Sequence, residues 1–294
     1  MWGGKDSTVL VDIIHNRMNL KDIPIVFVDV PTQYKELRSF TVENFENVEV
    51  LKPKHNFIEV CEKYGFPLIS KEIAQIISGA RKYKSTGKYK YFYDRVLGIN
   101  DYAKGGKRAS FKVTKYKSLL YAQFDISHEC CNIMKKKPAK EYERRTGRKA
   151  IIGTMAVESK FRESTWIKNG CNAFTSRRII SQPLMFWKEQ DILKYIYDNK
   201  LKICSVYGEV KVDEDGKYYT TGCDRTGCVM CGFGCHLEKE PNRFQKLAES
   251  HPSYLKLLDV CKNNGVTMRE AIEWCNEHIN RFHTELPPKD VDKT

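Results

Sequence analysis

The sequence predicts an α/β protein built on a doubly wound, mostly parallel sheet. Two observations lead to this class. Short runs rich in β-branched residues alternate with segments of helical periodicity, and a glycine-containing turn near the N-terminus leads directly into an apolar helix. In such a sheet the crossovers are right-handed, and ligands bind beyond the carboxyl ends of the strands. A helical insertion and a cysteine-rich C-terminal helical region are expected to complete the fold.

The first part of the chain contains the clearest strands and helices. Residues 23–30 are predicted to form a fully buried parallel strand, because the run is apolar, β-branched and ends at a proline. Residues 48–51 form a second short strand. Helices are expected over residues 32–45 and 56–64, so strands and helices alternate as a parallel sheet requires.

The remainder of the chain adds longer helical regions. A basic helix is predicted over residues 135–148, a buried strand over residues 150–156, and helices over residues 238–283 with a break at Gly265.

These elements suggest a division near residue 210. We expect an α/β nucleotide-binding domain over residues 1–210, with a basic helical insertion at 71–149. A cysteine-rich loop and C-terminal helices would follow over residues 211–294.

The turn at residues 3–8 has the composition of a phosphate-binding loop. Its two glycines let the backbone turn tightly and approach a ligand closely. Ser7 or Thr8 is expected to cap the following helix, whose N-terminus points free N–H groups toward the turn. No Gly-Lys pair in the chain is followed by Ser or Thr, so this is not a Walker A loop. The candidate phosphate-binding residues are Gly3, Gly4, Lys5, Asp6, Ser7 and Thr8.

The order Gly-Gly-Lys-Asp-Ser-Thr resembles the pyrophosphate loop (PP-loop) of the adenine nucleotide alpha-hydrolase superfamily of ATP pyrophosphatases. Phe27-Val28-Asp29 with Thr32, Leu51-Lys52-Pro53 and Tyr64-Gly65-Phe66-Pro67 resemble, in that order, the phosphoadenosine phosphosulfate (PAPS) reductase family of the superfamily. The resemblance implies a Rossmann-like fold of the PP-loop type. It also implies binding of ATP, adenylyl sulfate (APS) or PAPS, with Mg²⁺ as a further candidate cofactor.

Two regions beyond the loop are implicated in nucleotide binding by this resemblance. Val28 and Asp29 stand where the family cradles adenine and ribose, although Asp29 could equally be a strand-end cap. Gly153 and the segment from Glu158 to Arg162 resemble a family segment that faces the nucleotide. Arg162 therefore either contacts phosphate or sulfate through its planar guanidinium, or pairs with Glu158 at i,i+4. The resemblance implies Lys5, Asp6 and Arg162 as the catalytic candidates.

The eleven cysteines indicate metal or redox chemistry, since no secretory signal accompanies them. Cys223, Cys228, Cys231 and Cys235 fall within thirteen residues and alternate with glycines, so this loop could wrap a metal. The ligand type permits zinc, whereas the spacing of the first three cysteines coincides with a ferredoxin pattern.

A second cysteine arrangement is implied by the family. The adjacent pair Cys130-Cys131, together with Cys228 and Cys231, resembles the [4Fe–4S] signature of the adenylyl-sulfate reductase branch. The resemblance implies a cluster held by these four, with zinc as the alternative metal and Cys223 and Cys235 as alternate ligands. The family's nucleophilic cysteine lies in a C-terminal Glu-Cys-Gly-Leu-His motif. Here the nearest match surrounds Cys275 in a helical sequence.

The positive charge of the chain is concentrated in one segment. The net charge is +13, and residues 81–150 hold 20 Lys and Arg against 6 Asp and Glu, with 11 of the 34 aromatic residues. A basic, tyrosine-rich segment suits a nucleic-acid partner, because cations bind phosphates and rings stack on bases. The alternative is a solvated helical insertion.

Three functions are consistent with these features of the sequence. The first is an ATP-using enzyme that adenylates a tRNA or DNA target, releases pyrophosphate and transfers sulfur with the help of an iron–sulfur cluster. The second is an APS or PAPS reductase that uses a thiol. The third is a non-catalytic protein that binds nucleotide and nucleic acid. The expected partners are an adenine nucleotide and a sulfur donor or thiol reductant protein. The sequence has no signal peptide or membrane-length apolar run, so we expect a cytoplasmic protein without a membrane partner.

Overall fold

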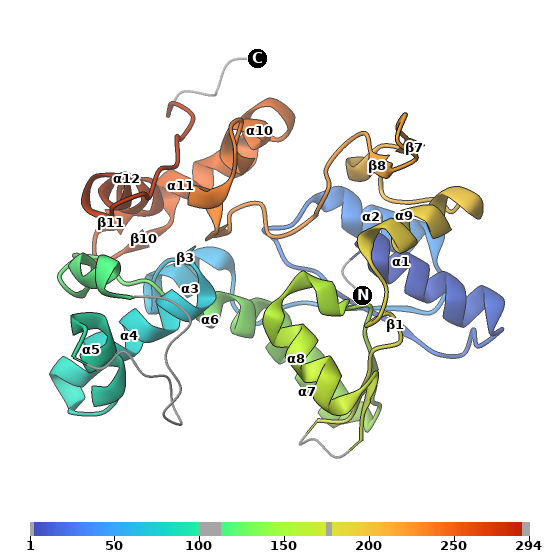
Figure 1. Ribbon diagram of the computed structural model, residues 1–294, viewed down its shortest axis with the longest axis horizontal. Coiled ribbons are helices and arrows are strands. Elements are labelled where there is room, and N and C mark those ends of the chain that lie inside the picture. The colour runs from blue at the N-terminus through green and yellow to red at the C-terminus, as the bar shows by residue number, and fades with distance from the viewer. Residues whose placement is uncertain (1–2, 100–112, 175–177, 290–294) are drawn as a thin grey trace. The chain divides into compact units, whose positions relative to one another are not determined.

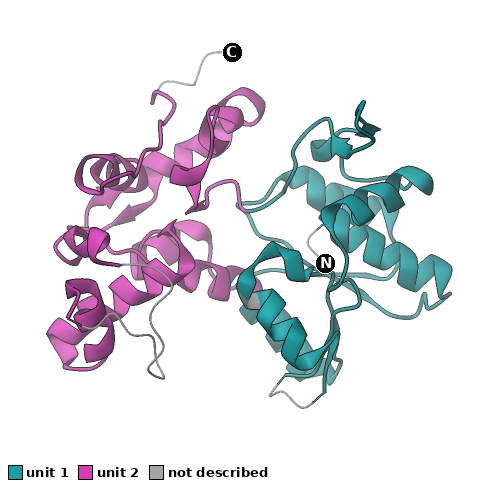
Figure 2. Cartoon of the chain, in the orientation of Figure 1, with its two compact units in different colours: residues 1–53, 136–227 teal, residues 54–135, 228–294 magenta. Residues whose placement is uncertain are grey.

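The computed structural model describes residues 3–99, 113–174 and 178–289. The chain divides into two compact units (Figure 2). Unit 1 comprises residues 1–53 and 136–227, and unit 2 comprises residues 54–135 and 228–294. Each unit therefore combines an early and a late stretch of chain. The two domains expected from the sequence, residues 1–210 and 211–294, stay a prediction.

Unit 1 is a set of short strands with helices packed around them (Figure 1). Its helices are α1 (Lys5–Val11), continued by a π-helical turn (Asp12–Arg17), α2 (Lys35–Asn44), α7 (Lys137–Thr146), α8 (Lys160–Asn169) and α9 (Glu189–Asp198), with 3₁₀ turns at Ala156–Glu158 and Ser205–Tyr207. Its strands are β1 (Ile25–Val28), β2 (Val48–Leu51), β4 (Ala150–Ile151), β5 (Asn172–Ala173), β6 (Ile180–Ser181), β7 (Val210–Val212) and β8 (Tyr218–Thr220).

Strand pairing in unit 1 confirms the expected α/β class. β1 and β2 are parallel, with Ile25 opposite Val48 and Val28 opposite Leu51. β4 is parallel to β6, and β5 joins the other side of β6 in antiparallel fashion. Among the described residues the pairing is divided between several short sheets rather than one continuous sheet.

The strand predicted over residues 150–156 is much shorter than expected. Only Ala150 and Ile151 pair as a strand, although the N–H of Ile152 still donates to the carbonyl of Ser181 at 2.9 Å. The partner strand β6 ends at Ser181 and is followed by Gln182 and Pro183, and a proline has no N–H to continue a ladder. The apolar run therefore reaches the interior without a partner strand.

The helix α1 is held in place by its apolar face. Val9, Leu10 and Ile14 are buried in one cluster with Ile192 and Ile196 of α9. Val9 and Leu10 are adjacent and Ile14 follows Leu10 by four residues, so the three lie on one side of the helix, as the sequence predicted. This packing brings the N-terminal ends of α1 and α9 into the same part of unit 1.

Unit 2 is mostly helical. Its helices are α3 (Phe57–Tyr64), α4 (Lys71–Thr86), α5 (Lys90–Leu97), α6 (Glu129–Cys131), α10 (Arg243–Ser250), α11 (Lys256–Val260) and α12 (Met268–His278), with a π-helical turn at Asn132–Lys136 and 3₁₀ turns at Thr114–Leu120, Cys235–Leu237 and Pro252–Leu255. Its strands are β3 (Leu68–Ile69), β9 (Gly232–Phe233), β10 (Lys262–Asn263) and β11 (Val266–Thr267).

A short extended segment, Phe66–Ile69, links distant parts of unit 2. The N–H of Phe66 donates to the carbonyl of Asp125, and its carbonyl accepts from the N–H of Ser127, both at 2.9 Å. At the other end of the segment, β3 runs parallel to β9, with Leu68 opposite Gly232. The segment 125–131 and the segment 228–233 are thereby attached to the same short strand.

The C-terminal helices are divided as the glycine predicted, and the break is a β-hairpin. β10 and β11 are antiparallel and are joined by Asn264 and Gly265, both with positive φ (50° and 84°). An Asn-Gly pair of this kind is the preferred two-residue hairpin turn. None of the helices in the described part of the chain has both the length and the apolarity needed to cross a membrane.

Replacing Gly65 by alanine should destabilise unit 2 strongly. Gly65 ends α3 with a φ of 92°, and a Cβ there would lie 2.3 Å from the carbonyl oxygen of Asp125. The backbone must then shift at the pairing of Phe66, and we expect a loss of about 3 kcal/mol in the free energy of unfolding.

Gly87 is the matched control for this substitution. Its φ is 68°, but an added Cβ would meet no atom within 4 Å, so Gly87→Ala should cost only about 1 kcal/mol. Urea unfolding followed by circular dichroism measures both values. Equal losses would show that the contact with Asp125 is unimportant.

Candidate functional site

The predicted phosphate-binding loop forms the start of α1 in unit 1. Gly3 has a φ of 66°, and a Cβ there would lie 2.9 Å from the carbonyl oxygen of Leu37, so the turn requires glycine. The helix is capped by Gly4, not by Ser7 or Thr8 as the sequence suggested. It begins at Lys5 because the turn is complete by Gly4, and Thr8 Oγ1 donates back to the carbonyl of Gly4 at 3.2 Å. The first-turn N–H groups therefore belong to Lys5, Asp6 and Ser7.

Lys5 is a buried cation with several partners. Its Nζ donates to Glu189 Oε1 at 2.7 Å and to the main-chain carbonyl of Asp224, and it lies 5.5 Å from the ring centre of Tyr207. The Lys5 side chain is only 6% exposed, whereas that of Glu189 is 51% exposed. The ammonium is thus held at a fixed place beside the loop, and the carboxylate that pairs with it remains open to solvent.

Tyr207 and Thr226 form a wall beside the glycine loop. The Tyr207 hydroxyl accepts from the Lys5 N–H at 3.4 Å and hydrogen-bonds the hydroxyl of Thr226. A Cβ on Gly4 would lie 3.3 Å from the Tyr207 hydroxyl oxygen. Gly153 approaches the loop from another direction, since a Cβ there would lie 3.1 Å from the Asp6 carbonyl oxygen. The structure therefore brings the predicted Gly153 against the predicted loop.

Asp6 carries an unusual carboxylate. Its Oδ1 is buried and has no hydrogen-bond partner. Burial raises the pKa of Asp6, and the charge of Glu189 adds to this effect, while Lys5, Arg225 and Arg162 oppose it. An unsatisfied buried carboxylate oxygen is costly, so it marks a position where a ligand or cation would be favoured.

Arg162 takes the ion pair that the sequence left as one of two alternatives. Its guanidinium contacts the carboxylate of Glu158, which also pairs with Arg225 at 3.3 Å. Burial and the positive charge of Arg225 lower the pKa of Arg162, whereas Asp6 raises it. Although Arg162 pairs with Glu158, it still affects the glycine loop, because its positive charge lowers the pKa of Asp6.

Val28 and Asp29 lie at the end of β1. Val28 is buried, and the Asp29 N–H donates to the carbonyl of Leu51 at 2.8 Å. The Asp29 carboxylate pairs with Arg38 of α2 at 3.1 Å. The ion pair gives Asp29 a structural role at the end of β1. Binding of a nucleotide by Asp29 stays a prediction.

Sequence reasoning missed several residues around the loop. Glu189, Tyr207, Asp224, Arg225 and Thr226 all contact or act on the loop, yet they come from segments remote from it in sequence. One signal was available, because Asp224 to Thr226 directly follow Cys223 in a glycine-rich stretch already singled out.

Unit 2 brings together the two cysteine pairs that the family resemblance linked. Burial raises the pKa of Cys130, and Cys228, Cys131 and Cys231 raise it further through their charges. These thiols are therefore close enough to influence one another. They meet because α6 follows the segment paired with Phe66, while the other pair directly precedes β9.

A cation and a backbone N–H next to these thiols favour their thiolate forms. Burial disfavours the ammonium of Lys135, but the charges of Cys228 and Cys131 and a hydrogen bond to Cys228 raise its pKa. Burial raises the pKa of Cys231 to about 11, although a hydrogen bond from the Phe233 N–H lowers it. Such N–H groups and cations stabilise thiolates.

The other cysteines of interest lie elsewhere. Cys223 belongs to unit 1, where its thiol lies 3.8 Å from the Tyr34 hydroxyl. Cys235 is buried, donates to the Gly232 carbonyl at 3.1 Å and accepts from Thr284 Oγ1 at 3.3 Å. Cys275 is fully buried in α12, and burial raises its pKa, so this thiol is not available as a nucleophile.

The described residues contain no group of three or more His, Cys, Asp or Glu side chains arranged around a single metal ion. Four thiols of unit 2, those of Cys130, Cys131, Cys228 and Cys231, nevertheless match an iron–sulfur cluster in donor type and number.

The basic helix expected over residues 135–148 is α7, with one change. Pro138 and Tyr142 are its buried residues, and Tyr142 donates to Glu49. Lys136, Lys137 and Lys140 are exposed, together with Arg144 and Arg145. Lys135, by contrast, lies against the thiols of unit 2 and contributes nothing to this exposed basic face of α7.

Three comparisons relate the chain to known proteins. The family model described as the phosphoadenosine phosphosulfate reductase domain matches residues 77–232. An uncharacterized protein of Methanocaldococcus jannaschii is 25% identical over 295 residues, an alignment that covers 98% of this chain and 51% of the relative. The chain thus spans about half the length of that relative.

A crystal structure of PAPS reductase from Candida auris, in complex with phosphate, is also similar. The alignment covers 69% of this chain and 71% of that chain, with 14% sequence identity and a TM-score of 0.34.

Proposed function

Because the chain belongs to the phosphoadenosine phosphosulfate reductase domain family, we propose that it is an adenine-nucleotide-dependent enzyme of sulfur chemistry. Its reaction is the adenylation of a target by ATP, followed by sulfur transfer. The observation that carries this proposal is the glycine loop, with a buried Lys5 at its side and an unsatisfied Asp6 carboxylate oxygen.

The loop has the groups that an ATP pyrophosphatase reaction needs. The first-turn N–H groups of α1 and the ammonium of Lys5 would bind the pyrophosphate that leaves. The bound phosphates would displace Glu189, which is half exposed and free to turn to solvent. Arg162 and Arg225 would stabilise negative charge developing at the α-phosphate. Asp6 Oδ1 would ligate Mg²⁺ carried by the nucleotide.

The chemical steps balance with two substrates and a sulfur donor. A carbonyl oxygen of the target attacks the α-phosphorus of ATP, and pyrophosphate leaves. Hydrosulfide supplied by the donor then attacks the adenylated carbon and loses its proton, the C–O bond breaks, and AMP leaves with the original oxygen. The protein supplies binding, orientation and charge stabilisation in both steps.

Cys130, Cys131, Cys228 and Cys231 are the residues that would hold a [4Fe–4S] cluster. A bound cluster supplies iron that exchanges electrons or binds sulfur. Lys135 beside Cys228, and the Phe233 N–H on Cys231, would offset the negative charge of the thiolates. The alternative is zinc bound by the same thiols. Analysis of the purified protein for iron, sulfide and zinc distinguishes the two.

A nucleic acid, with tRNA first, is the proposed target. Support comes from the exposed basic residues of α7, which are Lys137, Lys140, Arg144 and Arg145, and from Lys136 directly before the helix. Among these five residues, Arg145 has an acidic partner, Glu49, at 3.9 Å. A row of cations with few acidic partners is suited to phosphate groups spaced along a strand.

Reduction of APS or PAPS is the second candidate, and the family description favours it. That reaction needs a thiol to attack the sulfate sulfur. Cys275, the nearest match to the family nucleophile, is fully buried within α12. A reductase would therefore need another thiol. Release of pyrophosphate from ATP supports the first candidate, and release of sulfite from APS or PAPS supports the second.

Lys5→Ala should weaken ATP binding by about 1.5–3 kcal/mol, the scale of a lost charged hydrogen bond. Isothermal titration with ATP measures this change, and the melting temperature checks that the variant folds. Lys21→Ala, an exposed lysine of unit 1, is the control and should bind ATP as the native protein does. Equal affinity of Lys5→Ala and the native protein would remove the loop from the mechanism.

Cys130→Ser and Cys228→Ser should each abolish bound iron, because a cluster needs all its thiolates. Cys223→Ser, whose thiol lies in unit 1, should retain iron. Iron, sulfide and zinc analysis of protein purified under nitrogen measures the outcome. Iron lost from Cys223→Ser but kept in Cys130→Ser would favour the local loop instead, and stoichiometric zinc without sulfide would exclude a cluster.

Reversing Lys136, Lys137 and Lys140 to glutamate should weaken tRNA binding at least about tenfold at low salt and flatten its salt dependence, since fewer counterions are released. The control reverses three exposed lysines of unit 1 on other segments, Lys21, Lys202 and Lys217. Filter binding over a range of salt concentrations compares the two variants. Similar losses in both would show a general charge effect and no specific surface on α7.

A further inference from the structure

The C-terminal end of α4 and the start of α5, in unit 2, carry exposed tyrosines and lysines that the proposed function leaves unused. The two helices lie next to each other (Figure 1). No Asp or Glu occurs between residues 73 and 93, whereas this stretch contains five Lys and Arg and five aromatic residues. Positive charge interleaved with rings is the composition of a surface that binds nucleic acid.

Aromatic contacts fix the turn between α4 and α5. The Phe92 ring occupies the space beside Gly79, where an added Cβ would lie 2.4 Å from a ring carbon. The ring centres of Tyr83 and Tyr93 are 5.0 Å apart, which joins the two helices a second time. The tip of this helical hairpin, residues 84–90, is therefore held on a packed base, although each of its residues is exposed.

Tyr89 lies at this tip in a backbone conformation that favours glycine. Its φ is 70°, a left-handed value that costs free energy for a residue with a Cβ. Its ring is nearly parallel to that of Phe92, with an interplanar angle of 19° and ring centres 6.2 Å apart, yet the residue stays 55% exposed. Burial offsets only part of the conformational cost, so the supported, exposed ring favours a role in binding.

Tyr121 is a second exposed ring near the same end of α4. It is 70% exposed, and the ammonium of Lys84 lies 4.1 Å from its ring centre. Its backbone is fixed to the helix, because Arg81 donates to the carbonyls of Leu119 and Ala122, on either side of it, at 3.2 and 2.9 Å. A lysine beside an exposed ring suits a nucleotide, since the cation binds a phosphate while the ring stacks on a base.

Lys84 and Lys88 supply positive charge that is available to a ligand. In the residues that the structure describes, no carboxylate pairs with either ammonium, whereas the neighbouring Lys90 is paired with Asp94 at 2.6 Å. Cations near a helix C-terminus also stabilise the helix through its dipole. That structural role alone would require no exposed rings beside the lysines, and it predicts effects on stability rather than on binding.

We propose that residues 84–90 together with Tyr121, which we call the tyrosine surface, bind single-stranded nucleic acid. Bases stack on Tyr89 and Tyr121, and Lys84 and Lys88 bind phosphates of the same strand. A flexible strand can follow two rings that are not coplanar, whereas a duplex keeps its bases stacked on one another. The surface belongs to unit 2, so it is distinct from α7 of unit 1, and it does not depend on the proposed reaction.

Fluorescence anisotropy at low salt with three labelled probes tests the proposal: single-stranded RNA, single-stranded DNA, and duplex DNA. Each probe is about twelve nucleotides or base pairs long, and the single strands contain only pyrimidines so that they stay unpaired. At least one single strand should bind about ten times more tightly than the duplex. Charge alone would give the opposite order, because the duplex has the higher charge density. Tighter binding of the duplex, or no binding of either single strand, would overturn the proposal.

Substitutions of Tyr89 test the stacking. Tyr89→Gly suits the positive φ, so it should leave the melting temperature nearly unchanged, yet it should weaken binding of the single strand at least about fivefold. Tyr89→Phe keeps the ring and should bind as the native protein does. Tyr219→Ala removes an exposed tyrosine of unit 1 and is the control, with an expected change in affinity of less than about twofold. Unchanged binding in Tyr89→Gly would overturn the proposal.

The two lysines are tested by their salt dependence. Lys84→Gln with Lys88→Gln should weaken binding at least about threefold at low salt and flatten its salt dependence. The control, Lys246→Gln with Lys262→Gln, removes two exposed lysines on other elements of unit 2 and should do neither. In the charge-reversed α7 variant, Tyr89→Gly should reduce strand binding by the same factor as in the native protein. Complete loss of strand binding in the α7 variant alone would assign the strand to α7 and overturn the proposal.

Discussion

The pairing of Phe66–Ile69 with two distant segments is the constraint on which unit 2 depends. A buried backbone must find partners for its N–H and carbonyl groups, and this segment finds them in residues 125–127 and in β9. One cysteine pair follows the first partner and the other precedes the second. The thiols therefore lie near one another as a consequence of backbone pairing, before any metal contributes.

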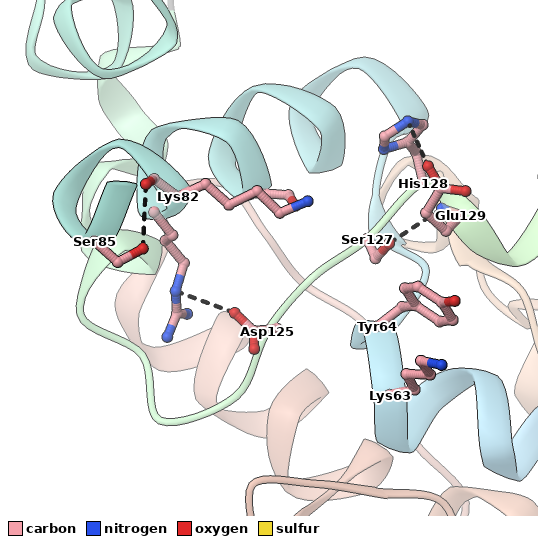
Figure 3. A pocket seen from close by; sticks show the side chains of 10 residues that line it. Lys63, Tyr64, Lys82, Ser85, Asp125, Ser127, His128 and Glu129 are labelled. Atoms are coloured by element: carbon pink, nitrogen blue, oxygen red, sulfur yellow. Dashed lines mark hydrogen bonds and ion pairs between the residues drawn. The ribbon is translucent and has the colours of Figure 1, made fainter. Parts of the chain in front are cut away.

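The same constraint holds the walls of a polar cavity of about 290 Å³ in unit 2. The carbonyl of Asp125 is held by Phe66, its carboxylate by Arg81, and Arg81 in turn by three carbonyls. Lys63, Lys82 and His128 are among the residues that line this cavity (Figure 3).

In unit 1 the corresponding constraint is the pairing of one buried cation, the ammonium of Lys5. An ammonium away from water must be paired, and Lys5 is paired with Glu189 and the Asp224 carbonyl. These partners hold the charge beside the glycine turn, where the N-terminus of α1 also points. The exposed carboxylate of Glu189 makes the pair exchangeable, so an incoming phosphate could take its place without leaving a buried charge unpaired.

Local patterns in the sequence were enough to predict the local features of this protein. The α/β class, β1, β2, the helices of the first part and the glycine turn could be predicted, because each rests on residues adjacent in the chain or at helical spacing. The family was also recognisable from short motifs such as the one at residues 3–8. The strand at 150–156 and the cap of α1 were wrong in detail, since strand length depends on the partner strand and a cap depends on where the turn closes.

Which residues act together depends on the tertiary fold. Glu189, Tyr207 and Thr226 reach the loop through packing between segments distant in sequence, and no local pattern encodes that proximity. Lys135 resembles the other lysines of its basic run, yet it lies against the thiols while Lys136 and Lys137 face solvent. Residues next to each other on a helix point in different directions, so their spacing in the sequence shows which face each one occupies. The segment that packs against each face is set by long-range contacts.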